Sequence, residues 1–475
     1  MNFVVKLVLC LQLLGAWVVS KEKTKIHDLR LCRPENIRER KNFNDLTVEE
    51  RGRLFRAIKK LNVMTSGENW EFFTQVHVKY FKLVHDTPLF LIWHRMYLFK
   101  LESALRSIDN TVSLPYWDWT HSSQDPSKDK VFSPQNFGGQ GDPRDECVKD
   151  GRFRKLRVAL FDGGKRVVDC IKRDPDFFSK VFQSPEPMEQ TTFNKSTILE
   201  FSSHLEVNGH AIVHNTVGSN FMTMSSPADP LFYLHHAFVD KLWYDRQKRN
   251  FGEKFPRREI NEKKLLPPWN INPMHLIDPL SHMCYFYKQN IYSWEPTYTS
   301  YKRRAAGDNA TFADQNLITT RKEKYEAEDQ IQECSDKIYQ AIIKEEKEGK
   351  EGVKENILSQ GLVAPKPEDK QDMCNLRVPD PPSRKYMKVM RLNITQYAKY
   401  IKAYCENKVH ISRLNTQPGF VSISALVQTN NSLSTARCTR PDFNVAKKID
   451  TEDVTKPIMK LQADMLPKSS VKNKA

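Results

Sequence analysis

Apolar residues recur at helical spacing in two parts of the chain. Between about 45 and 108, three segments place apolar side chains three or four positions apart: "VEERGRLFRAIKKLN", "NWEFFTQVHVKYFKLVH" and "LFLIWHRMYLFKLESALRSI". One face of the third segment carries Leu91, His94, Leu98, Leu101 and Leu105. A second helical pair is expected near 204–217 and 230–248. The pattern predicts a mainly α fold in which the two helix pairs form a four-helix bundle.

The segments outside these helices differ in composition. Residues 120–190 are rich in Gly, Pro, Asp and Ser, with turn signals "GGQGDPRD" and "DGGK", so we expect long irregular loops with little regular structure. Residues 303–375 are rich in Glu, Lys and Gln, which predicts a charged linker or polar helix. Residues 376–440 regain apolar content around "GFVSISALV" and predict a small C-terminal domain or cover. The main domain would then span 21–302, and 441–475 would be a basic, disordered tail.

The first 20 residues have the pattern of a signal peptide. Lys6 precedes the apolar run "LVLCLQLLGAWVV", which ends near Ser20, so we expect cleavage there and secretion. No later stretch reaches the ~18 apolar residues of a membrane span, so none is expected in the mature chain. Cys10 lies in the leader, and the other cysteines form an even set that predicts disulfides in an oxidising compartment. Asn-X-Ser/Thr sequons begin at Asn194, Asn309, Asn393 and Asn430.

The formal net charge of +16 does not indicate nucleic-acid binding. A secreted chain rarely meets nucleic acid, and the basic residues do not gather in one motif with interleaved aromatics. Much of the excess lies in the tail, where a solvated end is the simpler interpretation and attachment to an acidic matrix the alternative. We therefore expect no nucleic-acid partner, and the sequence predicts no oligomeric state.

Six histidines fall into two groups of three, one on each predicted helix pair. His210 and His214 are four apart, so both imidazoles lie on one helical face, and His236 is on the next helix. In the first group, His77 and His94 lie on successive helices and His85 on the turn between them. Antiparallel packing would bring each group together and place two metal ions side by side in the bundle.

A single histidine is more often a core or surface residue than a metal ligand, but six in this arrangement reverse those odds. All-imidazole coordination suits Cu, Zn, Fe or Ni, and neither group has the interleaved glutamate ligands of the carboxylate-rich di-iron bundles. Helical periodicity does not decide between the neighbours His235 and His236, because Phe232, His235 and Val239 form an equally plausible inward stripe.

The two segments "HVKYFKLVHDTPLFLIWHRMYLFKLESAL" and "HAIVHNTVGSNFMTMSSPADPLFYLHHAFVDKLW" resemble the copper-binding motifs of the tyrosinase family, with its "FLxWHRxYLxxxE" and "DPxFxxHHxxxDxxW" signatures. "LPYWDW" at 114–119 and "CYFY" at 284–287 extend the resemblance over roughly residues 30–290. "NTQPGFVSISALV" also resembles the end of some fungal-type members.

The resemblance implies a role for each site residue. His77, His85 and His94 would bind one copper ion, and His210, His214 and His236 the other. His235 would be a structural neighbour of His236, Phe232 would pack on the site, and Asp240 would form hydrogen bonds behind the ligands. With O₂ as co-substrate, the two coppers would oxidise a catechol to an o-quinone, as tyrosinases and catechol oxidases do.

Hydroxylation of a monophenol is expected to be weaker. The resemblance implies that family members that hydroxylate well use a glutamate four residues before the first histidine of the second group. This chain has Glu206 at that position. Such members also have an asparagine just after that histidine, where this chain has Ala211, which cannot hold the basic water. Asn215 is a weak candidate to compensate, and Glu206 could instead be an ordinary carboxylate at the surface or at a helix N-terminus. Leu83 replaces the cysteine that forms a thioether in many relatives, so His85 would depend on packing for its orientation.

Two other functions fit the same histidines. One is a zinc-loaded tautomerase, because Zn²⁺ accepts imidazole ligands but has no redox chemistry. The other is an oxygen-binding or matrix protein, related to the haemocyanins, in which 376–440 covers the metals. If that segment is removed by cleavage in the charged linker, the chain is instead a latent proenzyme. The substrate would be a small phenol or catechol, or tyrosyl side chains of a matrix protein.

Overall fold

The computed structural model describes residues 29, 31–250, 260, 264–288, 329–338, 340, 375–379, 389–391 and 394–417. The expected signal peptide, the basic tail, the "GFVSISALV" segment and three of the four sequons lie outside the described residues. The fourth sequon asparagine, Asn194, is exposed.

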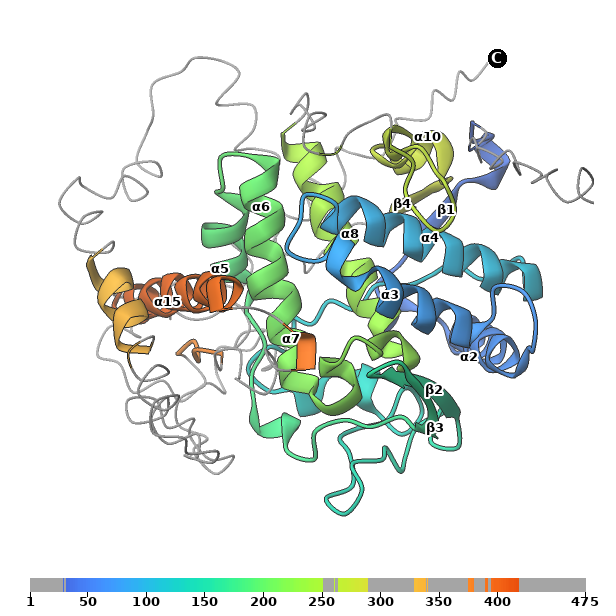
Figure 1. The fold of residues 1–475 in the computed structure, drawn as a ribbon, viewed down its shortest axis with the longest axis horizontal. Helices are drawn as coiled ribbons and strands as arrows, with labels where there is room; N and C mark the ends of the chain where they lie inside the picture. The colour runs from blue at the N-terminus through green and yellow to red at the C-terminus, as the bar shows by residue number, and fades with distance from the viewer. Residues whose placement is uncertain are drawn as a thin grey trace, which may run out of the picture.

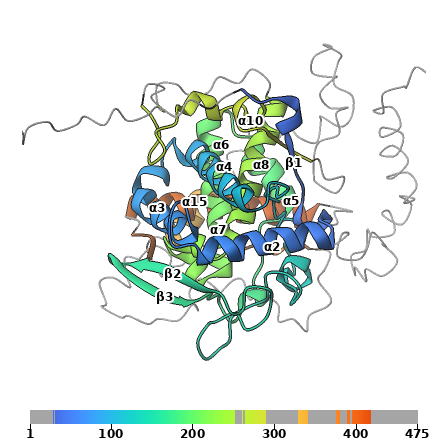
Figure 2. The ribbon, with the colours of Figure 1, turned by 90° about the vertical axis from the view of Figure 1, so that its right-hand side faces the viewer.

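Helices dominate the described residues, as the sequence predicts (Figures 1 and 2). The bundle contains α3 (Trp70–Val84), α4 (Phe90–Ile108), α8 (Leu231–Arg249) and one long composite helix. The composite helix runs from α6 (Ile198–Leu205) through the π-helical turn η8 (Glu206–His210) into α7 (Ala211–Val217). Helix α2 (Val48–Val63) packs on the outside, against α4 and α3.

Helix starts follow from local capping. Thr47 and Glu50 form a reciprocal capping box at the start of α2, and Thr197 and Glu200 form another at the start of α6. Asn69 accepts a hydrogen bond from the backbone N–H of Phe72 at the start of α3. These caps satisfy backbone donors that would otherwise lack partners at the bundle surface.

Helix α8 is the central element of the core. Every residue of α8 from Leu231 to Arg246 is buried, so this helix has no polar face. Its aromatic and aliphatic side chains join one large core with those of α2, α3 and α4. Side chains of α8 therefore have to find polar partners inside the protein rather than in water.

The expectation of little regular structure over 120–190 is wrong in one place. Strands β2 (Arg157–Asp162) and β3 (Lys165–Cys170) form an antiparallel hairpin. Its turn is the "DGGK" signal, where Gly163 (φ 54°) and Gly164 (φ 85°) both adopt the positive φ angles that a two-residue hairpin turn requires. The glycines predicted the turn, but the short valine-containing strands on either side were overlooked.

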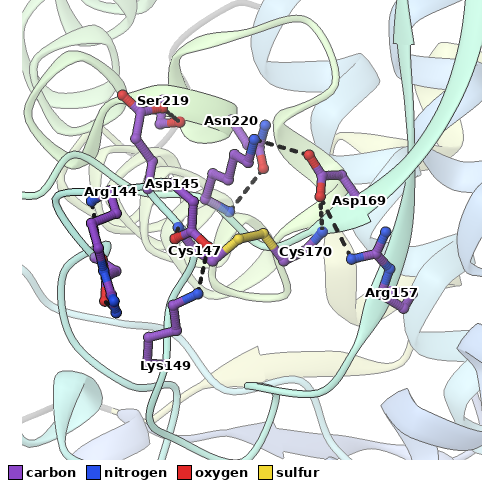
Figure 3. The surroundings of a disulfide bond; sticks show 12 residues. Arg144, Asp145, Cys147, Lys149, Arg157, Asp169, Cys170, Ser219 and Asn220 are labelled. Carbon is purple, nitrogen blue, oxygen red and sulfur yellow. Dashed lines mark hydrogen bonds and ion pairs between the residues drawn. A yellow bond between two sulfur atoms is a disulfide. The ribbon is translucent and has the colours of Figure 1, made fainter.

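A disulfide closes the base of this hairpin (Figure 3). Cys170 ends β3 and is bonded to Cys147 in the preceding loop. Beside it, Asp169 forms ion pairs with Lys172 at 2.9 Å and with Arg157 at 3.6 Å. The disulfide and these surface contacts tie the long loop to the hairpin.

A second, parallel pair of strands joins the two ends of the main domain. Strand β1 (Arg38–Arg40) pairs with β4 (Tyr285–Tyr287), and a disulfide links Cys32 to Cys284. The strand pairing and the disulfide thus hold the start of the main domain against the "CYFY" motif.

Helix α15 (Ile394–Thr416) falls within the predicted C-terminal domain and packs on the main domain. It contacts η8 and α5 (Pro185–Pro187), and Figure 1 shows α15 beside α5. A disulfide joins its Cys405 to Cys334, which lies in the described helical segment 329–338 of the charged region. Whether 376–440 forms a domain of its own stays a prediction, because much of it lies outside the described residues.

The remaining elements are single turns. None of the helices among the described residues combines the length and the apolar character that crossing a membrane requires. The turns are η2 (Pro34–Asn36), η3 (Phe43–Asp45), η4 (Pro126–Lys128), η5 (Lys130–Phe132), η6 (Phe177–Ser179), η7 (Met188–Phe193), η9 (Ser219–Met222), η10 (Ser226–Ala228), η11 (Pro273–Leu276) and α10 (Pro279–His282).

Candidate metal centre

The first group of histidines is assembled by the end of α3 and by α4. His77 lies in α3, His94 lies in α4, and His85 is the residue at which α3 ends. The helix stops there because His85 is extended and Asp86 has a positive φ of 54°. The ring centroids lie 4.9 to 5.7 Å apart, and the three histidines offer ligand atoms within 4.8 Å of one another.

The second group comes from the composite helix and α8. His210 and His214 lie on one face, with ring centroids 4.5 Å apart, and His236 lies 4.9 Å from His210 and 5.5 Å from His214. The π-helical turn η8 ends at His210, so the extra residue in that turn helps to set the direction of this ring. Gly209 fits closely there, because a Cβ would lie 2.8 Å from Met188 Cε and 3.2 Å from the Trp119 ring, so a larger residue would make these side chains shift.

Hydrogen bonds fix the orientation and the tautomer of most of these rings. The Nδ1 atoms of His77 and His94 each lie 2.8 Å from a backbone carbonyl, of Met224 and Phe90 respectively. Nδ1 of His85, His210 and His214 also lies against a carbonyl oxygen. Because a carbonyl oxygen can only accept, each Nδ1 must carry the proton, which leaves the Nε2 lone pair free for a metal ion.

The Nε2 atoms have the environment expected of metal ligands. Those of His77, His94 and His210 are buried and have no hydrogen-bond partner. Nε2 of His214 lies 3.2 Å from Nε2 of His236, where two lone pairs would repel unless a proton or metal ion intervened. Two sets of three neutral imidazoles therefore fit two copper or zinc ions.

Burial also keeps these imidazoles neutral. It lowers the pKa of His77 to about 4 and that of His214 to about 3, because an apolar interior disfavours the charged ring. The pKa values of His85, His94, His210 and His236 are lowered for the same reason and by the neighbouring histidines. A neutral ring is the form that binds a metal ion, so the site is prepared for one at neutral pH.

The two groups meet directly inside the apolar core. The rings of His94 and His236 stack with centroids 4.6 Å apart, the shortest ring contact between the groups. Phe232 stacks on His236 at 4.0 Å and lies 5.2 Å from His77, so it packs on both groups. Two ions held here would lie side by side, and Phe232 would help to exclude water.

His235 is a seventh buried histidine, located behind the second group. Its ring lies 4.9 Å from His214 and 5.5 Å from His210, and both of its ring nitrogens lack a hydrogen-bond partner. It offers a nitrogen within 4.8 Å of the second group. Within the described residues, none of its ring contacts reaches His77, His85 or His94. The geometry therefore favours His236 as the ligand that faces the other metal, and this assignment stays a prediction.

Glu206 is buried, so the alternative that it is a surface or N-terminal carboxylate is wrong. It is 3% exposed, it lies inside the composite helix, and its Oε1 accepts a 2.8 Å hydrogen bond from the backbone N–H of Asp86. Burial raises the pKa of Glu206 well above its usual range. Ala211 is fully buried, and Asn215 is half-buried one residue after His214.

Asp240 is buried beside α4, but among the described residues its hydrogen bonds do not go to a histidine. It binds Arg95, which follows His94, and the hydroxyls of Tyr285 and Tyr287 on β4. The sequence analysis did not single out Arg95 as a site residue. A signal was present, because Arg95 lies within the "WHR" motif, and a buried arginine needs a partner.

Comparison with known proteins shows which family the chain is similar to. Residues 67–249 match the family model for the common central domain of tyrosinase. The chain is 33% identical over 275 residues to a tyrosinase of Streptomyces glaucescens, with 51% of this chain and 97% of the relative covered. It is 30% identical over 282 residues to a tyrosinase of Streptomyces lincolnensis, with the same coverage. A polyphenol oxidase structure from Thermothelomyces thermophila is similar at 18% identity and a TM-score of 0.46, covering 55% of this chain and 91% of that one.

Proposed function

Because the chain belongs to the tyrosinase family and is an oxidoreductase of the tyrosinase and catechol oxidase type, we propose that it is a secreted dicopper oxidase that converts o-diphenols to o-quinones. The observation that carries the proposal is the pair of facing histidine groups with free, buried Nε2 atoms. Two copper ions bound there would supply the redox chemistry by which two catechols and one O₂ give two o-quinones and two waters.

The chain's own residues orient the ligands and exclude water. Backbone carbonyls hold the Nδ1 protons, so five imidazoles present Nε2 to the centre without further rearrangement. Phe232 and the surrounding apolar residues help to keep the metal centre dry, which strengthens electrostatic interactions there. The rigid bundle thus supplies a preformed site, as metal sites in helix bundles require.

Catechols are the favoured substrates over monophenols. Ala211 has no polar atom with which to hold a water beside His210, and it is covered by apolar side chains. Glu206 has the position expected of a proton-accepting carboxylate, but burial raises its pKa and so favours its neutral form. The natural substrate would be a small phenol or catechol, or tyrosyl side chains of a matrix protein, in melanin formation or protein crosslinking. The three disulfides of the described residues support an extracellular location.

Metal analysis combined with O₂ uptake tests the proposal. We expect about two copper ions per chain, as two three-histidine sites imply, and O₂ uptake that is faster with catechol than with phenol. Zinc in place of copper, without O₂ uptake, would favour the tautomerase alternative. Copper with reversible O₂ binding and no catechol oxidation, even after α15 is removed, would favour an oxygen carrier.

The position of α15 supports a latent form of the enzyme. Tyr397, Tyr400 and Ile401 of α15 pack in one apolar cluster with Phe81 and Ala211. Phe81 stacks on the ring of His85 at 4.1 Å, and Ala211 follows His210. A phenol approaching the metals from this side would have to pass α15.

Buried polar contacts hold α15 in place. Asn407, 1% exposed, accepts a hydrogen bond from Gln183 at 2.9 Å and donates one to Asn208. Glu406 pairs with His204 at 2.9 Å and with Lys195 at 3.2 Å. The amide contacts of Asn407 are deeply buried and those of Glu406 are partly buried, and such a network is costly to break one contact at a time, so α15 would leave as a unit or stay.

We predict that a cut within 341–374 does not by itself activate the enzyme. The disulfide Cys334–Cys405 joins the chain before the cut to α15 after it, and such a tether keeps the local concentration of α15 near millimolar. At nanomolar protein, catechol oxidation should rise after cleavage and reduction together but not after cleavage alone.

The matched control replaces both Cys334 and Cys405 with serine, since reduction also breaks the other disulfides. In that variant, cleavage alone should release the C-terminal piece, as seen by size-exclusion chromatography. Release of the C-terminal piece from cleaved wild-type protein whose Cys334–Cys405 disulfide is intact would contradict the prediction.

A further inference from the structure

Arg95 and Asp240 form a buried ion pair between the two helices that carry facing ligands. Arg95 directly follows His94 on α4, and Asp240 lies one helical turn after His236 on α8. Arg95 Nε lies 2.5 Å from Asp240 Oδ1, and the residues are 0% and 3% exposed. One contact therefore links the backbone that carries a ligand of the first group to the backbone that carries a ligand of the second.

The carboxylate of Asp240 is held by several further donors. Its Oδ2 accepts hydrogen bonds from the hydroxyls of Tyr285 at 2.6 Å and Tyr287 at 2.7 Å, both on β4. Arg40 Nη1 of β1 lies 3.5 Å from the same oxygen, and its guanidinium lies over the Tyr285 ring. Four groups from three elements thus fix the position of one side chain of α8.

The guanidinium of Arg95 is held on its other side. Its Nη1 donates to the backbone carbonyl of Ile277 at 2.8 Å and to the side chain of Gln247 at 3.0 Å. Its carbon lies 3.5 Å from the centre of the Trp243 ring, in a cation–π contact. Because the planar guanidinium of Arg95 has several fixed partners, movement of α4 along α8 would break some of these contacts.

The distance between these two helices matters for the metals. His94 and His236 make the shortest ring contact between the two histidine groups, at 4.6 Å. Two metal ions act jointly on one small ligand only when they are roughly 3.5 to 4 Å apart. We propose that Arg95 and Asp240 are positioning residues that set the separation of the two metal ions by fixing α4 against α8, an inference that rests on the proposed dicopper function.

The test compares Asp240→Asn with wild type in the copper-loaded, oxidised protein. Two closely bridged Cu²⁺ ions pair their spins and give no EPR signal, whereas separated ions do. We expect Asp240→Asn to retain both coppers, to show the EPR signal of uncoupled Cu²⁺, and to lose roughly 10- to 100-fold in catechol turnover, as loss of a ligand-supporting contact does elsewhere. Arg95→Lys keeps the charge but cannot span all of these partners, so the same signal is expected if Asp240→Asn fails to fold.

Asp245→Asn is the matched control. Asp245 forms an equally buried ion pair with Lys241 at 2.6 Å, but that pair lies within α8 and does not join it to α4. This variant should lose stability and remain EPR-silent. The inference is overturned if Asp240→Asn stays EPR-silent with normal turnover, or if Asp245→Asn shows the same signal. An uncoupled signal in the wild type would instead contradict the proposed function itself.

Discussion

Replacing His236 with alanine is expected to lower the bound copper from about two ions per chain to about one, whereas His235→Ala retains about two. The reason is geometric. The His236 ring stacks on His94 of the other group, and its Nε2 lies 3.2 Å from that of His214. Of the two histidine groups, the His235 ring contacts the second and, within the described residues, makes no ring contact with the first. Loss of His236 would leave two imidazoles for the second copper, and catechol oxidation should fall to background.

Elemental analysis of the two purified variants, with thermal unfolding as the control for folding, decides between the neighbours. Both variants remove one buried imidazole from adjacent positions of α8, so their losses of packing should be similar. Equal metal loss in the two variants would show that His235 also binds the second ion. Loss of metal from His235→Ala alone would reverse the assignment.

The histidines and their helices could be predicted because both signals are local. A spacing of four places His210 and His214 on one face of any helix, and an apolar stripe indicated the buried face of α4. The choice between His235 and His236 could not be made this way. The whole first four turns of α8 are buried, so no polar face exists to show which side points to the metals.

Contacts between distant parts of the chain were beyond the sequence analysis. Arg95 and Asp240 are 145 residues apart, and nothing in the local pattern of either shows that they meet. The packing of α15 depends likewise on distant pairings, such as that of Asn407 with Asn208, which are 199 residues apart. Such pairings follow from how the bundle assembles, whereas helical periodicity reports only which face of each helix is buried.

The metal-free chain is expected to be unusually sensitive to acid. Seven histidines at the centre are at most 7% exposed, and burial lowers the pKa of each. In the unfolded chain a histidine has a pKa of about 6.5. Below that pH the unfolded chain takes up protons that the folded chain cannot, until the pH reaches the folded-state value, about 4 for His77.

The sign and size of the effect follow from this difference in bound protons. The contribution of the buried neutral histidines to the free energy of unfolding is fully present above pH ~6.5. It is lost as the pH falls toward ~4, at roughly 1.4 kcal/mol per pH unit for each buried histidine. With a total stability of about 5–15 kcal/mol, several such residues suffice to unfold the metal-free chain above pH ~4.

Urea midpoints measured from pH 7 to pH 5 should fall steeply without metal. They should fall less with Zn²⁺, which binds only the neutral rings of the folded chain. The variant His235→Leu, which removes a buried histidine that is not a proposed ligand, should lower the slope by about one proton. A midpoint that does not change between pH 7 and pH 5 would show that the buried histidines are charged or hydrated in the metal-free chain, and would remove the basis for a preformed neutral site.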